Sequence, residues 1–265
     1  MAVSFEFKEK YNFNDLVEIV RILREPGGCP WDMEQTHQSI RENFLEETYE
    51  VIEAIDTNNR ELMQEELGDV LLQVLMHSDM ARTEGWFTID DVADGISQKL
   101  IIRHPHVFGD VNVNSTDDVL KNWDTIKRQT KDQRTQSEAM AAIPATYPAL
   151  MKAQKVQEKA KKAGFDWREA DGAFDKISEE AAELKEALAR GDKASVEDEL
   201  GDLLFSVVNT ARFCGCEAET ALDKATKKFM ARFNIVEKLA SEKGIDMKSA
   251  SIEVLDELWD CAKKN

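Results

Sequence analysis

Residues 46–72 carry a stretch that recurs, with few changes, further along the chain. They read EETYEVIEAIDTNNRELMQEELGDVLL, and residues 179–205 read EEAAELKEALARGDKASVEDELGDLLF. A shift of 133 residues aligns the two stretches without a gap, and ten of the 27 aligned positions are identical. Such self-similarity is typical of a duplicated structural unit. The chain of 265 residues therefore predicts two copies of about 130 residues each.

A polar segment separates the two copies. Residues 127–140 read KRQTKDQRTQSEAM and hold few apolar side chains, which is typical of a linker. Two prolines in IPATYP (143–148) then bracket the start of the second copy. We expect the first copy at residues 1–130, the linker at 131–147 and the second copy at 148–265.

Apolar periodicity predicts an all-α fold, a tandem pair of helical bundles. In each copy apolar residues recur at i, i+3, i+4, i+7 and i+8, which places them along one face of a helix. These residues are Leu67, Val70, Leu71, Val74 and Leu75 in the first copy, and Leu200, Leu203, Leu204, Val207 and Val208 in the second. No alternating strand pattern of convincing length is present, and the chain has only 5 Pro and 12 Gly to break helices.

Each copy carries two pairs of carboxylates spaced three residues apart, which share a helix face. The pairs are Glu47 with Glu50 and Glu66 with Asp69 in the first copy, and Glu180 with Glu183 and Glu199 with Asp202 in the second. The midpoint between the pairs is residue 58 in one copy and Gly191 in the other. Two antiparallel helices that turn at these midpoints would bring both pairs to one height, roughly 14 Å from the turn.

Four converging carboxylates would repel one another and raise their pKa values unless a cation lay between them. Ligands that are all oxygen favour Mg²⁺, with Mn²⁺ as an alternative. About a fifth of all residues are acidic, so one such set could arise by chance, whereas a second set at identical spacing favours a site over a solvated face. A di-iron site would need Glu-x-x-His on two helices, and only Glu34 and His37 have that spacing.

The bulk composition excludes several classes of function. A formal net charge of −18 argues against nucleic-acid binding. No apolar run reaches the roughly 18 residues of a membrane span, and the N-terminus has no signal-peptide pattern. The four cysteines show no metal-ligand spacing and predict free thiols. We therefore expect a cytoplasmic protein that binds neither nucleic acid nor membrane.

The ordered set of motifs resembles the MazG family of nucleoside triphosphate pyrophosphohydrolases, in its two-domain bacterial form. The resemblance spans nearly the whole chain and rests on GCPWDMEQTHQSI (28–40), LEETYEV (45–51), ELGDVLLQV (66–74), IIRHPHVFGD (101–110), PALMKAQKVQ (148–157), AGFDW (163–167) and ELGDLLF (199–205). It implies an all-α fold, Mg²⁺ dependence and hydrolysis of NTPs or dNTPs to the monophosphate and pyrophosphate. It also implies nucleotide-pool housekeeping or control of a stress nucleotide, and homodimers whose bundles are completed across the subunit interface.

The resemblance also implies roles for residues of the second copy. Mg²⁺ would be held by the four catalytic carboxylates Glu180, Glu183, Glu199 and Asp202. Glu179 would accept a proton from the water that attacks the α-phosphorus. The nucleotide would be contacted by Lys176, Ser195, Lys228, Arg232 and Trp259, with Trp259 stacked on the base.

We expect the second copy to carry most of the activity. At the positions of Lys176 and Ser195 the first copy has Asn43 and Leu62, so it lacks one cation directed at phosphate. Its carboxylates Glu47, Glu50, Glu66 and Asp69 would still bind metal. The alternatives are a nucleotide-binding regulatory protein without turnover and a helical scaffold whose acidic face is only solvated.

Overall fold

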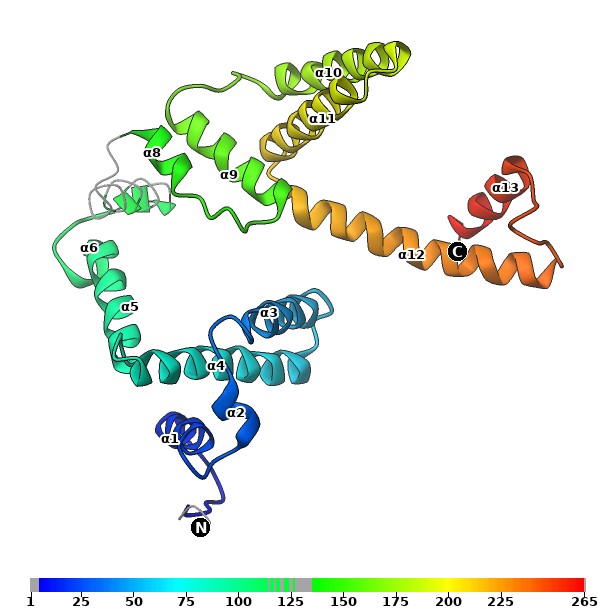
Figure 1. Cartoon of the computed structure of the whole chain (residues 1–265). Helices are drawn as coiled ribbons and strands as arrows, with labels where there is room; N and C mark the ends of the chain where they lie inside the picture. Colours follow the sequence, from blue (N-terminus) through cyan, green and yellow to red (C-terminus); the bar gives the residue numbers. More distant parts are fainter. Residues whose placement is uncertain are drawn as a thin grey trace. The chain divides into compact units, whose positions relative to one another are not determined.

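The computed structural model describes residues 5–113, 115–116, 118–119, 122–123, 126 and 135–264. These residues form helices and turns, and no strand occurs among them, which confirms the predicted all-α class. The chain divides into two compact units, residues 1–127 (unit 1) and 128–265 (unit 2) (Figure 1). No helix in the described part combines the length and apolar character needed to cross a membrane.

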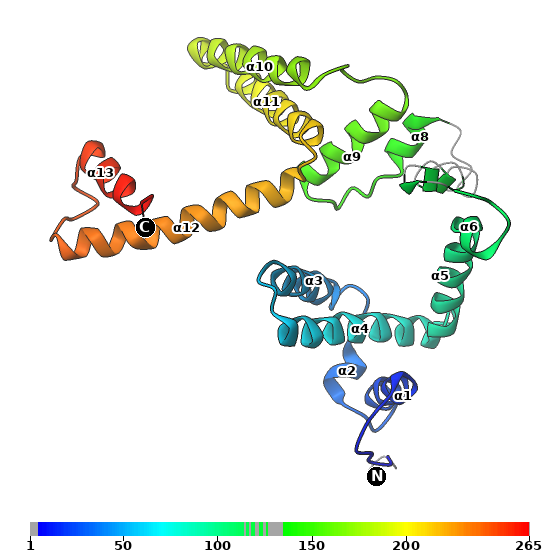
Figure 2. The ribbon, with the colours of Figure 1, turned by 180° about the vertical axis from the view of Figure 1, so that it is seen from behind.

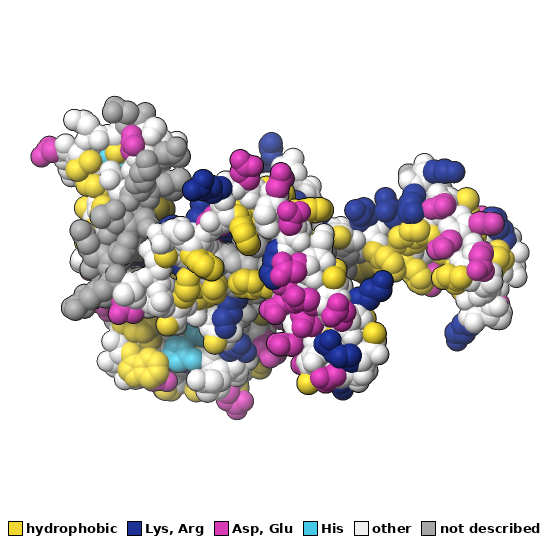
Figure 3. All heavy atoms as spheres, turned by 90° about the horizontal axis from the view of Figure 1, so that it is seen from above, with side chains coloured by type: hydrophobic (Ala, Val, Ile, Leu, Met, Phe, Trp, Pro, Cys, Tyr) yellow, Lys and Arg dark blue, Asp and Glu magenta, His cyan; other side chains and the backbone are white. Residues whose placement is uncertain are grey.

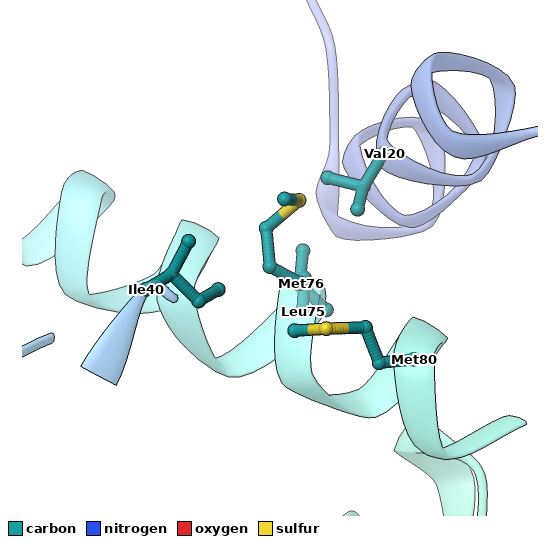
Figure 4. Close-up of a cluster of buried hydrophobic side chains, with 5 residues drawn as sticks. All are labelled: Val20, Ile40, Leu75, Met76 and Met80. Carbon is teal, nitrogen blue, oxygen red and sulfur yellow. The ribbon is translucent and has the colours of Figure 1, made fainter. Parts of the chain in front are cut away.

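Unit 1 packs its N-terminal helix against its longest helix. Its elements are α1 (Phe13–Arg24), α2 (Pro30–Glu34), α3 (Arg41–Asp56), α4 (Arg60–Thr83), α5 (Ile89–Arg103) and α6 (Pro105–Phe108). The side chain of Asn12 caps α1 by accepting from the backbone N–H groups of Asn14 and Asp15. Figure 4 shows the core of this unit, in which α1 meets α4 beside the residue that precedes α3; the buried side chains are Val20, Ile40, Leu75, Met76 and Met80.

Unit 2 contains α8 (Gln136–Ala141), α9 (Ala149–Lys162), α10 (Ala170–Arg190), α11 (Lys193–Phe213), α12 (Ala218–Glu242) and α13 (Ile252–Ala262). Helix α9 packs against α8, α11 and α12, whereas α13 packs against α12 alone among the described helices (Figure 2). The contact between α12 and α13 buries Val236, Ala240, Leu258 and Ala262. Helix α8 lies within the predicted linker, and residues 131–134 of that linker lie outside the described residues.

Two helical hairpins, α3–α4 and α10–α11, are built alike. Asn58 and Gly191 adopt positive φ angles of 53° and 68° in the turns. This left-handed backbone is open to glycine and is tolerated by asparagine better than by most residues. The side chains of Asn59 and Asp192 then cap α4 and α11. The turns predicted at residues 58 and 191 are thus confirmed.

The predicted apolar stripes are only partly buried. On α11, Val208 is 1% exposed but Leu204 is 48% exposed. On α4, Leu75 is buried while Leu67 lies at the surface. Helices α3 and α10 each contact only their hairpin partner among the described helices, so nothing covers the outer part of each stripe. Where bundles were expected, α3–α4 and α10–α11 are therefore open hairpins. Apolar side chains lie at the surface among charged ones (Figure 3).

Candidate metal centre

In unit 1 the α3–α4 hairpin brings the predicted carboxylates together. Glu47 of α3 and Glu66 and Asp69 of α4 each place one carboxylate oxygen within 4.8 Å of the others. Glu66 is buried, and its side chain is hydrogen bonded with that of Glu50. All four predicted carboxylates of the first copy therefore belong to one cluster.

The α10–α11 hairpin repeats this arrangement in unit 2. Glu180 of α10 and Glu199 and Asp202 of α11 place carboxylate oxygens within 4.8 Å of one another. Glu180 is the buried member of this set, and Glu183 is hydrogen bonded with Glu199. The antiparallel hairpin thus produces the same convergence in both copies, as its turn position predicts.

Charge crowding perturbs the carboxylates in both clusters. Burial raises the pKa of Glu66, and the adjacent Glu50 and Asp69 raise it further. Burial also raises the pKa of Glu47, with added repulsion from Asp69 and Glu50. In unit 2, burial and the neighbouring Glu183 raise the pKa of Glu199. Since a bound cation would reverse these shifts and every ligand atom is an oxygen, the clusters fit a hard divalent ion.

A lysine lies beside the carboxylate cluster of unit 2. The ammonium of Lys176 lies 2.6 Å from a carboxylate oxygen of Glu180 and 2.7 Å from one of Glu179. Hydrogen bonds with Glu179 and then with Glu180 raise the pKa of Lys176. The corresponding residue of unit 1 is Asn43, which carries no charge. Lys176 therefore places a positive charge directly beside the carboxylate cluster of unit 2.

The other residues of the predicted site lie at different places in unit 2. Glu179 is exposed, next to Lys176. Ser195 lies in the first turn of α11, where its hydroxyl donates to Asp192 over 2.7 Å. Lys228 and Arg232 lie on α12. Trp259 lies on α13, where its ring packs against Phe229 with centroids 5.1 Å apart.

Within one chain, Lys228, Arg232 and Trp259 do not lie beside the carboxylates. Helix α13 contacts only α12 within the described part of the chain, and α10 contacts only α11. Trp259 is therefore a packed residue of the α12–α13 pair in this structure. The carboxylates and Lys176 form one cluster, whereas Lys228, Arg232 and Trp259 belong to a separate helical pair.

Sequence reasoning missed a histidine pair in unit 1. The Nδ1 atoms of His37 and His77 lie 2.7 Å apart, and the ring of Trp86 stacks on His37. Glu34, paired with His37 in the rejected di-iron hypothesis, belongs to neither carboxylate cluster. The two histidines are 40 residues apart and follow no shared periodicity, so no sequence pattern indicates their contact.

Comparison with known proteins adds independent information on the two hairpins. A model described as the MazG nucleotide pyrophosphohydrolase domain matches residues 35–108 and 171–238, more than half of the chain. The chain belongs to the MazG family. Each matched segment contains one complete carboxylate cluster, so the MazG domain occurs twice.

Relatives in the MazG family resemble the chain over nearly its full length. The nucleoside triphosphate pyrophosphohydrolase/pyrophosphatase MazG of Thermotoga maritima is 48% identical over 251 residues, which is 95% of each chain. The nucleoside triphosphate pyrophosphohydrolase of Escherichia coli K12 is 42% identical over 94% of this chain and 96% of that protein. An uncharacterized Bacillus subtilis protein, YabN, is 46% identical over 96% of this chain but only 52% of its own length.

Proposed function

We propose that this MazG-family protein hydrolyses nucleoside triphosphates to nucleoside monophosphate and pyrophosphate in the presence of Mg²⁺. The observation that carries the proposal is the convergence of Glu180, Glu199 and Asp202 on the α10–α11 hairpin, with Glu183 beside Glu199 and Lys176 beside Glu180. Family membership supports it, as do the names of the relatives from T. maritima and E. coli. We place the main working site in unit 2.

Glu180, Glu199 and Asp202 would hold the ion, together with Glu183. Mg²⁺, when bound, supplies charge neutralisation for a triphosphate and lowers the pKa of a coordinated water. Mn²⁺ would accept the same oxygen ligands. The raised pKa of Glu199 is consistent with this assignment, because it reflects burial of the carboxyl group together with repulsion from Glu183 and Glu180.

We assign the remaining residues of the hairpin to the substrate. The ammonium of Lys176 can contact a phosphate bound beside the carboxylates, because it already lies within 3 Å of two of them. Ser195 presents a hydroxyl at the start of α11, where an anion is favoured by the helix dipole. Glu179 is exposed beside Lys176, and we assign it to proton acceptance from the attacking water.

We further propose that the protein works as a homodimer. Large apolar side chains are exposed along the hairpins and along α12, among them Leu200, Leu204, Phe229 and Met230. Groups of exposed apolar side chains often mark a surface that a partner covers. A second chain could supply Lys228, Arg232 and Trp259 to the hairpin, which would reconcile their family role with their place on α12 and α13.

One observation favours a second function for unit 1. It retains its carboxylate cluster but has Asn43 in place of the lysine. We propose that unit 1 binds a metal-nucleotide complex with little turnover. A chain in which both units behave in this way would be a regulatory nucleotide-binding protein.

Incubation of the full chain with Mg²⁺ and each common NTP and dNTP tests the proposal. Chromatography of the products should show nucleoside monophosphate and pyrophosphate in equal amounts. Tight binding without product would favour the regulatory alternative. Release of nucleoside diphosphate and inorganic phosphate would contradict cleavage between the α- and β-phosphates. The same panel would identify the preferred base and sugar.

A further inference from the structure

The turn between α11 and α12 holds two cysteines one residue apart. Cys214 and Cys216 flank Gly215, and both cysteines are exposed. The chain has four cysteines, so half of them lie in this one turn. The thiol of Cys216 points back over the turn, with its Sγ atom 3.7 Å from the carbonyl oxygen of Cys214. Accessible thiols that lie beside a second cysteine are typical of reversible oxidation sites.

The backbone of the turn brings the two cysteines close together. Gly215 has a positive φ of 68°, its N–H donates to the carbonyl of Arg212, and the N–H of Cys216 donates to the carbonyl of Ala211 over 2.9 Å. This hydrogen-bond pattern reverses the chain at the end of a helix. Residues two apart lie roughly 7 Å from each other even in an extended chain, and the reversal shortens this distance. A disulfide requires Cα atoms about 4.4–6.8 Å apart, so the turn suits one.

Unit 1 builds the same turn without cysteines. After α4, Gly85 has a φ of 73°, and the N–H of Trp86 donates to the carbonyl of Ala81 over 2.8 Å. The residues that flank this glycine are Glu84 and Trp86. The turn therefore requires the glycine and not the thiols. The cysteine pair is a feature of unit 2, where we place the main working site.

A buried glutamine of α9 holds the cysteine turn where α9, α11 and α12 meet (Figure 1). Gln154 is only 4% exposed. Its Nε2 donates to the carbonyl of Cys216 over 3.2 Å, and its Oε1 accepts from the N–H of Ala218, the first residue of α12, over 2.9 Å. Both polar groups of this amide thus depend on the path of the turn. A shift of the backbone at Cys216 would leave them unpaired, which is unfavourable for a buried group.

We propose that Cys214 and Cys216 form a dithiol switch that a low-molecular-weight disulfide, such as glutathione disulfide, oxidises. The thiolate of one cysteine attacks the small disulfide and releases one small thiol. The second cysteine loses its proton, attacks the resulting mixed disulfide and releases the other small thiol. The turn is then oxidised to a Cys214–Cys216 disulfide, and the small disulfide is reduced to two thiols. Closure of this ring around Gly215 draws the Cys216 backbone away from Gln154 and loosens the start of α12.

Mass spectrometry of the full chain after treatment with glutathione disulfide tests ring closure. The tryptic peptide 213–224 contains Cys214 and Cys216 and no other cysteine. We expect this peptide to lack two hydrogen atoms and to take up no N-ethylmaleimide, and dithiothreitol should restore both thiols. Cys214→Ser should stop at a glutathione adduct on Cys216, whereas the matched control Cys261→Ser should still close the ring. Two glutathione adducts, or two thiols that still react with maleimide, would overturn the proposal.

Hydrogen exchange at the start of α12 tests the loosening. The N–H of Ala218 is bound to Gln154, so peptides that contain it should exchange on the order of tenfold faster after oxidation. Gln154→Ala should exchange faster already in the reduced protein, with no further increase on oxidation. Cys261→Ser should respond as wild type does. A disulfide that forms and leaves this exchange unchanged would show that the turn is not a switch.

Pyrophosphate release connects the switch to the working site, and this step alone rests on the proposed function. Helix α12 carries Lys228 and Arg232, which we assign to the nucleotide. Oxidation should therefore lower the rate severalfold in wild type and in Cys261→Ser, but not in Cys214→Ser. If reduced wild type releases no pyrophosphate, the proposed function fails, and the mass and exchange measurements still decide on the switch. If wild type is active and keeps its rate when peptide 213–224 is fully oxidised, the switch does not control the site and the inference fails alone.

Discussion

The buried ion pair between Asp166 and Arg212 allows a quantitative test of how unit 2 is held together. It joins the AGFDW loop to α11, with side chains only 14% and 6% exposed. Removal of one partner leaves the other charge buried and unpaired, which costs about 3–5 kcal/mol. For comparison, the pair of Lys155 with Glu158 on α9 is 42% and 36% exposed, and an exposed pair contributes about 0–1 kcal/mol.

The perturbation is Asp166→Ala, with Glu158→Ala as the matched control. At about 1.36 kcal/mol per factor of ten, a loss of 3 kcal/mol lowers the hydrogen-exchange protection of α11 amides by roughly a hundredfold. Mass spectrometry of peptides from α11 measures this change, and peptides from α4 in unit 1 serve as the internal reference. The double variant Asp166→Arg with Arg212→Asp should recover part of the loss, because unit 1 has an acid at the equivalent place on α4.

Two outcomes would show that the buried charges do not stabilise unit 2 in this way. If Asp166→Ala and Glu158→Ala reduce protection equally, burial of the pair does not determine its contribution. If the charge-swapped variant is no better than Asp166→Ala, the pair is not acting through its charges, and the non-additivity expected of contacting residues is missing.

Three further predictions concern the metal, the histidine pair and assembly. Mg²⁺ at a hundred times its Kd should stabilise the protein by about 2.7 kcal/mol in a thermal melt. The stabilisation should be smaller at pH 5 than at pH 8, because the raised pKa of Glu199 lets protons compete with Mg²⁺ for this carboxylate. Glu199→Gln should reduce the stabilisation by Mg²⁺. Burial, and then the neighbouring His37, lowers the pKa of His77. Neutral His77 therefore contributes stability above the ordinary histidine pKa of 6.5, and this contribution is lost as the pH falls below that value. Urea denaturation at pH 7.5 and 5.5 should show a loss of stability at the lower pH that His77→Phe abolishes. Sedimentation velocity should show a dimer that Met230→Glu dissociates and Phe7→Glu does not.

Much of the hairpin could be predicted from the sequence. The spacing of Glu180 and Glu183 fixes their helix face, and a turn midway to Glu199 and Asp202 fixes their height, so local geometry alone determines that they meet. Asn58 and Gly191 also favour the left-handed backbone that each turn requires, so they predict the turn at the same position. These inferences need no knowledge of long-range packing.

The rest depends on contacts that periodicity does not specify. An apolar stripe identifies a helix face, but it does not say what covers that face, and Leu204 is exposed for this reason. The position of Trp259 depends on how α13 packs, and in one chain it packs on α12. A pocket lined by Gln157 forms between α8, α9, α11 and the AGFDW loop, and no periodicity in the sequence predicts it.

We propose that the carboxylates of unit 2 perform the chemistry and that those of unit 1 contribute little to it. Pyrophosphate release by full-length Glu180→Gln and Glu47→Gln, with Mg²⁺ and saturating triphosphate, tests it most directly, since each substitution removes one charge from one equivalent cluster. We expect Glu180→Gln to abolish pyrophosphate release and Glu47→Gln to retain most of it. Release that survives Glu180→Gln and is lost in Glu47→Gln would instead place the working site in unit 1.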